Sequence, residues 1–199
     1  MAFSVTEFKS NLKQGGARPS LFKVDLLYPS GVTNPPTRSE FLVRASSLPA
    51  SNIGTHEVFF HGKSIKVAGD RTFDTWETTI INDEDFGIRN TIEEWMNLVS
   101  NVKLNTRDNS FGVSEGDNVN YKKDLTVTQF SKQGDAIKIY KFMNAFPTAL
   151  SPITLDWGAG EIEEFSCTWT YDHWESASAS SGDTGGSATF TPTFTSPSG

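Results

Sequence analysis

Alternating apolar and polar positions run through most of the chain and predict strands. In the segment LFKVDLLY, Phe22, Val24 and Leu26 share one face of an extended backbone, and charged residues take the other face. The same alternation predicts strands over residues 41–45, 75–81, 125–130 and 136–142. A last pair of strands is expected over 153–157 and 161–174, joined at Gly158-Ala159-Gly160.

Two β-rich runs in the middle of the chain, THEVFF and KSIKVA, lie on either side of His61-Gly62. Two residues of this kind between alternating runs are typical of a tight β-hairpin. The sequence therefore predicts a hairpin between Ile53 and Gly69 that projects from the body of the fold.

After residue 83, the spacing between apolar residues changes from every second residue to every third or fourth residue. Apolar side chains recur on one stripe, which predicts a single amphipathic helix with Asn82 or Asp83 as its cap; they are Ile88, Ile92, Trp95, Met96 and Val99. A short helix is also expected over residues 5–12. The predicted fold is mainly β: a small closed antiparallel β-barrel or sandwich with one flanking helix.

Composition divides the 199 residues into two parts. Residues 1–175 have the pattern of one barrel domain, and residues 176–199 form a C-terminal extension rich in Ser, Thr and Gly. In that extension Phe190 and Phe194 fall on the same side of an extended strand, so we expect them to anchor the tail on another surface. Residues 101–120 show no period and predict a long loop.

Charge and apolar content limit the possible partners. The net charge of -7 and the scattered Lys and Arg residues disfavour wrapping around nucleic acid, whereas an acidic surface would let DNA slide past. No stretch of about 18 consecutive apolar residues is present, so neither a membrane span nor a signal peptide is expected. We expect synthesis and folding in a cytoplasm, with Cys167 as a small buried hydrophobe.

The residues for catalysis or metal binding lack the usual spacing. His56, His61 and His173 form no zinc motif, and no nucleophile elbow, phosphate-binding loop or calcium loop occurs. The sequence predicts no enzyme activity, no cofactor and no metal site. A carbohydrate-binding β-sandwich is an alternative because tryptophan faces stack on sugars. However, Trp76, Trp95 and Trp169 fall on apolar faces typical of a core, and we expect only Trp157 and Trp174 to be free for another role.

Three motifs together carry a family resemblance: VAGDRTFDTW running into the predicted helix, LDWGAGEIEEF, and YDHWE. They resemble the tail tube protein of contractile-tailed, T4-like bacteriophages over most of residues 18–175. The segment Tyr121-Lys122-Lys123 matches as well. The family-motif residues, which are also the candidate assembly residues, are Gly69, Asp70, Arg71, Phe73, Trp76, Tyr121, Asp156, Trp157 and Trp174. Gly69 permits a bend, and Asp70 with Arg71 could pair across subunits or stabilise an internal turn.

The resemblance implies a structural virion protein that does no covalent chemistry. Hexameric rings would stack into a hollow tube inside a contractile sheath, template that sheath, and contact baseplate and tail terminator proteins. DNA would pass through the lumen without specific binding, and no membrane would be involved. The hairpin and the 101–120 loop are candidates for reaching adjacent rings. Tubes of type VI secretion and contractile injection systems share this architecture and remain alternatives.

Overall fold

The structure is a computed structural model that describes residues 4–11, 16–33, 35–36, 39, 42–107 and 121–178. Its helices are α1 (Val5–Asn11) and α2 (Gly87–Val99). Its strands are β1 (Phe22–Asp25), β2 (Val43–Ser46), β3 (Asn52–Phe60), β4 (Lys63–Thr72), β5 (Trp76–Ile81), β6 (Ser100–Asn101), β7 (Thr106–Arg107), β8 (Lys123–Phe130), β9 (Ala136–Leu150), β10 (Glu164–Thr170) and β11 (His173–Ser178). The predicted mainly β, antiparallel fold is confirmed.

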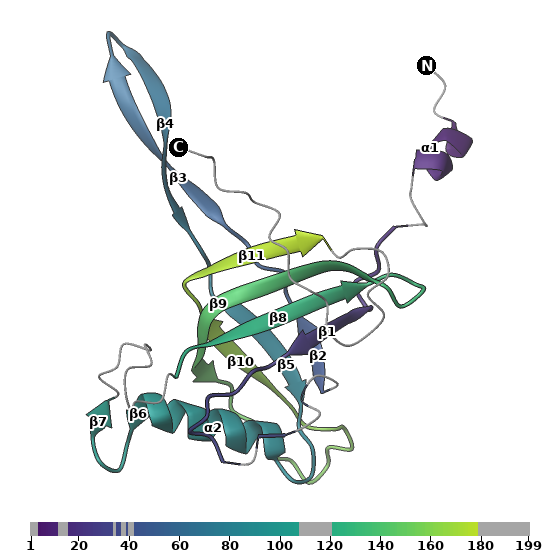
Figure 1. The fold of residues 1–199 in the computed structure, drawn as a ribbon, viewed down its shortest axis with the longest axis vertical. Coiled ribbons are helices and arrows are strands. Elements are labelled where there is room, and N and C mark those ends of the chain that lie inside the picture. Colours follow the sequence, from purple (N-terminus) through teal and green to yellow (C-terminus); the bar gives the residue numbers. More distant parts are fainter. Residues whose placement is uncertain are drawn as a thin grey trace.

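Seven strands form one sheet that folds into two layers (Figure 1). Layer one contains β1, β8, residues 136–145 of β9, and β11. Layer two contains the rest of β9, then β10, β5 and β2. The register of β10 on β9 continues unchanged into β11, from Thr170 opposite Phe146 to His173 opposite Met143. One long bent ribbon therefore connects the two layers.

Strand β9 changes layer at Asn144, which has a left-handed φ of 57°. The Asn144 N–H donates to Asp124 Oδ1 (3.1 Å), and its Nδ2 donates to Asp172 Oδ2 (2.8 Å). Asn is one of the few residue types that adopt this conformation readily. The strand also runs through Pro147, well past its predicted end at residue 142. Pairing with β8 ends at Ala145, so the missing N–H of proline disrupts no ladder on that side.

The core lies between the layers and is rich in aromatic rings. Trp76 stacks on Phe142 with 4.2 Å between ring centroids, and Trp169 lies 5.5 Å from Trp95 of α2. The three tryptophans expected in the core are each at most 1% exposed, and Cys167 is fully buried, so these predictions are confirmed. Such rings contribute most of the apolar area that a core buries.

Helix α2 begins later than predicted, at Gly87. The residue before it, Phe86, has a φ of 54° and makes no side-chain cap, so the prediction of Asn82 or Asp83 as the cap is wrong. Asp85 Oδ1 instead accepts a hydrogen bond from the Gly87 N–H (3.1 Å), which supports the turn into the helix. The buried residues of α2 are Ile88, Thr91, Ile92 and Trp95.

Two other expectations concern the pairing of the strands. The hydrogen-bonded path of the described strands starts at β1 and ends at β2, and no pairing joins these two strands, so closure of the barrel remains a prediction. The expected hairpin around Gly158-Ala159-Gly160 is wrong because β10 pairs with β9 and β5, and residues 151–163 form a loop. Phe41 and Leu12, predicted element ends, lie outside the described residues.

The predicted hairpin is present and extends far from the two layers (Figure 1). Among the described strands, β3 and β4 pair only with each other, and His61 and Gly62 both have positive φ (46° and 78°), as a type I′ turn requires. At about 3.3 Å per residue, strands of this length reach roughly 30 Å. Within the described part of the chain, no helix has the length and apolar character needed to cross a bilayer.

Candidate assembly surfaces

The described residues bring together no catalytic or metal-binding group. His56 and His61 lie in the hairpin and His173 lies in β11, and no cluster of three potential metal ligands is found among the described residues. Burial raises the pKa of the Cys167 thiol far above its usual value, so this group stays protonated. The candidate functional features are therefore surfaces that could join copies of the chain.

The motif at Gly69 forms a β-bulge in the hairpin. Gly54 of β3 lies opposite two residues of β4, Gly69 and Asp70, because the register shifts between Ile53 and Thr55. A side chain at Gly69 would lie 2.9 Å from the His56 ring and 3.2 Å from the Gly54 carbonyl oxygen. Glycine leaves room here for the His56 ring and the Gly54 carbonyl oxygen, and the bulge bends and twists the hairpin near its base.

The two charges of the same motif are exposed on β4. Neither Asp70 nor Arg71 has an ion-pair partner within 4 Å among the described residues. An internal turn-stabilising ion pair between them is thus not formed. Pairing across subunits stays a prediction.

The aromatic residues of the motif connect the hairpin to the core. Phe73 lies 6.2 Å from Tyr171 between ring centroids and packs against the core cluster. The Trp76 indole N–H donates to Ser46 Oγ (3.1 Å) and to the Ser47 carbonyl oxygen (2.9 Å). These residues hold the base of the hairpin against β5 and the chain that follows β2, so their direct role is structural.

Two further candidate residues also make intramolecular contacts. The Tyr121 carbonyl oxygen accepts a 2.7 Å hydrogen bond from Trp95 Nε1, which fixes the end of α2 to the start of β8. The indole N–H of Trp174 donates to the Ala50 carbonyl oxygen (3.2 Å), and its ring packs edge-on against Tyr140. Trp174, expected to be free, is therefore partly buried.

Asp156 and Trp157 lie at the opposite end of the molecule from the hairpin. Asp156 Oδ1 accepts the Gly158 N–H (2.9 Å) in a tight turn that leaves Trp157 fully exposed. Leu155 and Ile162, in the same loop, are also more than 70% exposed. An exposed tryptophan beside two exposed aliphatic residues is typical of an interaction site.

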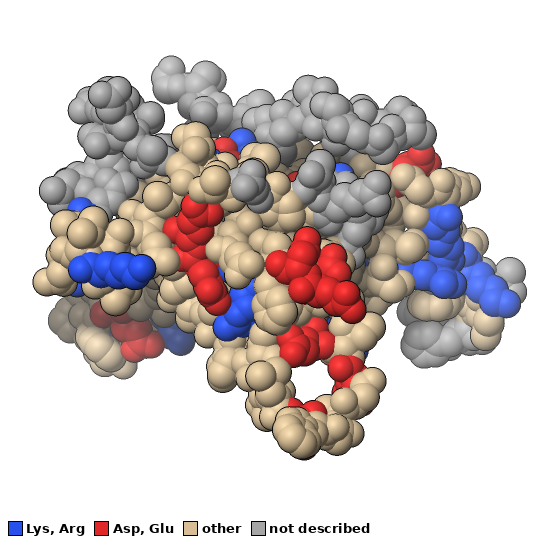
Figure 2. All heavy atoms as spheres, turned by 90° about the horizontal axis from the view of Figure 1, so that it is seen from below, with Lys and Arg blue, Asp and Glu red and all other residues tan. Residues whose placement is uncertain are grey.

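Acidic residues surround this apolar group. Seven carboxylates and no Lys or Arg occur in the loop of residues 82–86 and in residues 152–164, which are the loop before β10 and the first residue of that strand. The two segments are joined by Asn82, whose backbone N–H and Nδ2 donate to the carbonyl and carboxylate oxygens of Glu163, both at 2.9 Å. Figure 2 shows the molecule from this end, where acidic side chains gather. We call these two loops the acidic end.

The hairpin carries a second apolar surface that the sequence analysis did not assign. The register places alternate side chains of β3 and β4 on one face of the hairpin, where His56 lies opposite Val67. The apolar side chains on this face are all at least half exposed; they are Val58, Phe60, Ile65 and Val67. We call this the apolar face of the hairpin. The other face carries the Glu57–Lys66 ion pair (3.6 Å) and Phe59. In the sequence, this surface was indicated only by alternating apolar residues in the hairpin for which no core partner was predicted.

Some predicted features lie outside the described residues. They are the tail anchors Phe190 and Phe194 and most of the 101–120 loop, of which the structure describes residues 101–107. The carbohydrate-binding alternative loses its main support, because Trp76, Trp95 and Trp169 are buried in the core and present no sugar-stacking platform.

Comparison with known proteins identifies the family. The family model described as phage tail tube protein matches residues 17–177. The tail tube protein gp19 of Enterobacteria phage T4 is 31% identical over 161 residues, which cover 80% of this chain and 91% of the T4 protein.

Solved structures agree on the fold. The tube-terminating cap of the anti-feeding prophage matches with a TM-score of 0.59 at 20% identity, covering 82% of this chain and 92% of that one. The sheath-tube complex of the extracellular contractile injection system PVC in its extended state matches with a TM-score of 0.55 at 16% identity, covering 89% and 99%. The chain therefore belongs to the phage tail tube protein family, whose members are structural, non-enzymatic components of the virion.

Proposed function

We propose that six copies of this chain form a ring, and that rings stack helically into the hollow inner tube of a contractile phage tail. The tube is the conduit for DNA ejection and the template for the surrounding sheath, and its ends contact baseplate and tail terminator proteins. The chain is synthesised in the cytoplasm of the bacterial host. The T4 relative, which is a tail tube protein, supports this function.

The observation that carries the proposal is the pair of open edges in layer one. Among the described strands, β1 pairs only with β8, and β11 pairs only with β9, so the layer has one unpaired edge on each side. Unpaired edges are templates for pairing with another chain. If β11 of one copy pairs with β1 of the next, the same contact repeats around a closed ring and no edge of layer one remains. Layer one would thus be completed by its neighbours.

The packing of layer two on layer one determines which face of layer one would point toward the lumen of such a ring. Layer two and α2 pack on one face of layer one, so a continuous ring of layer one has room for them only on its outside. The other face of layer one would then line the lumen. On this face Lys23 lies 3.0 Å from Asp25, and Lys141 lies 2.9 Å from Asp124. Lysines neutralised in this way offer DNA phosphates little attraction, which supports passage without binding.

The hairpin suits a contact between rings because it extends well beyond the two layers. An isolated two-stranded hairpin is only marginally stable in water, and this one exposes four large apolar side chains on a single face. A neighbouring copy that covers the face would stabilise it.

Electron microscopy of the purified protein tests the proposal. We expect hollow tubes of uniform diameter built from rings with sixfold symmetry. Monomers that persist at high concentration, or rings of another symmetry, would contradict it.

A second candidate is the tube of a contractile injection system, because two such structures share the fold. Tails isolated with DNA-filled heads would favour the phage tube, and headless particles would favour the injection machine.

A further inference from the structure

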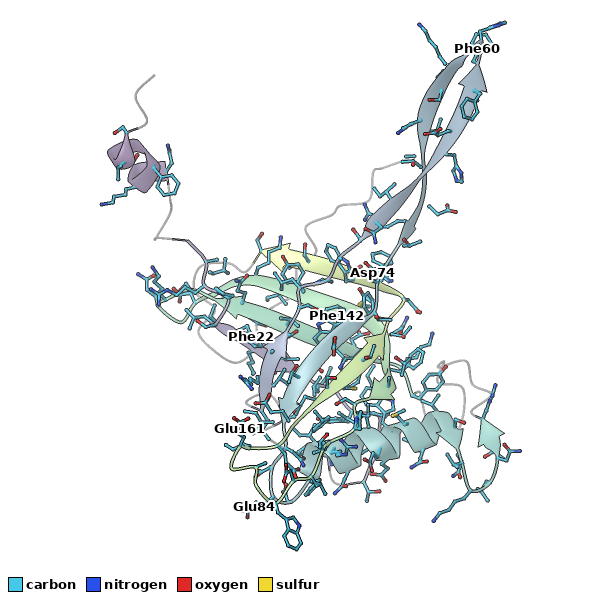
Figure 3. All side chains as sticks on the ribbon, turned by 180° about the vertical axis from the view of Figure 1, so that it is seen from behind. Phe22, Phe60, Asp74, Glu84, Phe142 and Glu161 are labelled. Carbon is cyan, nitrogen blue, oxygen red and sulfur yellow. The ribbon has the colours of Figure 1, made fainter. Side chains whose placement is uncertain are left out.

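Strand β11 ends at the same side of layer one at which β1 begins. Ser178, the last residue of β11, lies opposite Lys138 of β9. The same row continues through Gln129 of β8 to Phe22, the first residue of β1. Figure 1 shows the end of β11, the turn between β8 and β9 and the start of β1 together on the right. In Figure 3 Phe22 accordingly lies far from the tip of the hairpin at Phe60. The chain that follows β11 therefore leaves layer one beside the start of β1.

Two cavities with mainly apolar walls flank the segment that leads into β1. The turn cavity, of about 210 Å³, lies between residues 16–18 and residues 130–132, with Ile137 as a further wall. The β1 cavity, of about 110 Å³, is lined by Pro19, Phe22, Ser46, Leu48, Val127 and Gln129. The Phe130 N–H donates to the Leu21 carbonyl oxygen (2.9 Å), which fixes the chain before β1 against the end of β8. The walls of both cavities are thus held in place by the fold.

The C-terminal extension contains two aromatic rings that fit these cavities. Residues 179–199 lie outside the described residues and beyond residue 177, where the match to the family model stops. Their large apolar side chains are Phe190 and Phe194, which an extended backbone places on one side about 13 Å apart. An apolar cavity of about 150 Å³ holds a benzene ring. The turn cavity can therefore take one whole ring, and the β1 cavity can take part of the other.

The charges of the extension and of the turn cavity are also complementary. Asp183 is the single charged residue in the sequence of the extension. The turn cavity has two basic residues in its walls, Arg18 and Lys132. Opposite charge of this kind steers a segment toward its binding site.

The extension is long enough to reach these cavities on a neighbouring copy. Adjacent strands lie about 4.8 Å apart, so β11 is about 14 Å from β1 of its own chain, because β9 and β8 lie between them. In the proposed ring, β11 instead lies one strand spacing from β1 of the next copy. A Gly- and Ser-rich linker such as residues 179–189 spans roughly 18 Å on average. The β1 cavity of the neighbour is therefore the nearer one, and it is within reach.

We propose that the C-terminal extension of each copy binds across the start of β1 of the next copy in the ring. Because the extension meets the neighbour's β1 before it meets the turn between β8 and β9, Phe190 occupies the β1 cavity and Phe194 the turn cavity. This inference rests on the proposed ring. It assigns the extension the task of holding adjacent copies together, in addition to the pairing of their strand edges.

Cysteine cross-linking in assembled rings tests the contact. The variant Phe194→Cys/Ile137→Cys has one thiol in the extension and one in the wall of the turn cavity, and the native Cys167 is fully buried. Each disulfide between these positions would join two copies. Mild oxidation should therefore give a ladder of covalent species up to six copies on a non-reducing gel. Phe194→Cys/Leu155→Cys is the matched control, because Leu155 is exposed but lies at the acidic end, and it should give no such ladder.

A second measurement tests whether the contact stabilises the assembly. The variant Phe190→Ser/Phe194→Ser should still form rings, because its strand edges are unchanged. The urea concentration at which its tubes dissociate should be lower than for the wild type, because two apolar rings no longer enter the cavities. Thr191→Ser/Thr193→Ser changes the opposite side of the same extended segment and should leave this concentration unchanged.

Three results would overturn the inference. Disulfide-linked monomers without a ladder would show that the extension binds its own copy. A ladder no stronger than that of the Leu155→Cys control would show that it does not bind the turn cavity, and unchanged dissociation of Phe190→Ser/Phe194→Ser tubes would show that the rings hold nothing together. Electron microscopy of the same samples separates these results from failure of the proposed function, because that function requires the wild type to form rings whatever the extension binds.

Discussion

The buried hydrogen bond between Trp169 and Thr78 allows a quantitative test of the core. Trp169 Nε1 donates to Thr78 Oγ1 (2.9 Å), and Thr78 Oγ1 lies 3.5 Å from the Cys167 carbonyl oxygen. Both side chains are fully buried, so no water can replace a lost partner. Thr78→Val keeps the shape but leaves the indole N–H unsatisfied, which costs about 1–3 kcal/mol. For a chain of this size, 2 kcal/mol lowers Tm by roughly 4–8 °C.

The double variant separates the hydrogen bond from packing. Trp169→Phe removes the N–H, so adding Thr78→Val to it should be nearly neutral, because both polar partners are then absent. Urea unfolding of the four proteins, each at a concentration at which sedimentation shows a monomer, gives the interaction energy. We expect a coupling of about 1–2 kcal/mol. Equal costs of Thr78→Val in both backgrounds would refute the reasoning, since the hydroxyl would then stabilise the fold independently of Trp169.

Two further predictions concern layer one. Asn144→Gly should change the free energy of unfolding by less than about 1 kcal/mol, because glycine adopts a φ of 57° without strain. Asn144→Val should lower the free energy of unfolding by at least about 1–2 kcal/mol, because a β-branched residue is strained at this φ. Thermal unfolding checks both variants, and equal Tm values would contradict the strain argument. Asp124→Asn should make assembled tubes retain DNA at low salt, because Lys141 loses the carboxylate at 2.9 Å. Lys141→Gln added to it restores neutrality, and retention should disappear in a co-sedimentation assay.

Local sequence patterns were sufficient to predict an element wherever its structural partner is close in sequence. The β3–β4 hairpin was predictable because two alternating runs flank His61-Gly62, and both residues have the positive φ that such a turn needs. The core tryptophans were predictable because their apolar neighbours share their periodicity.

Elements whose partners are distant in sequence were not predictable in the same way. The pairing of β10 with β5 depends on a partner more than 80 residues away, so a nearby Gly-Ala-Gly segment was mistaken for a hairpin turn. The left-handed Asn144 allows β9 to continue in a new direction, although a Pro follows at 147 and normally marks the end of a strand. In both places the tertiary contact overrides the local signal.

The candidate site shows a related ambiguity. Alternating apolar residues such as Val58, Phe60 and Ile65 look the same in sequence whether they face the core of their own chain or a second chain. Exposure of the whole hairpin distinguishes the two cases, and exposure is visible only in the structure. Trp157 was correctly expected to lie outside the core, and the structure leaves it fully exposed.

Strand β5 explains why an assembly of this kind needs a rigid core. The hairpin enters one end of β5 and the acidic end leaves the other, so its six residues set the distance and angle between these two surfaces. In a heterologous contact the rotation between copies decides whether a ring closes or a filament of fixed pitch forms. Trp76, Thr78 and Ile80 hold this strand through stacking, a buried hydrogen bond and full burial. Core variants that fold but loosen β5 should therefore produce tubes of irregular pitch before they lose the native state.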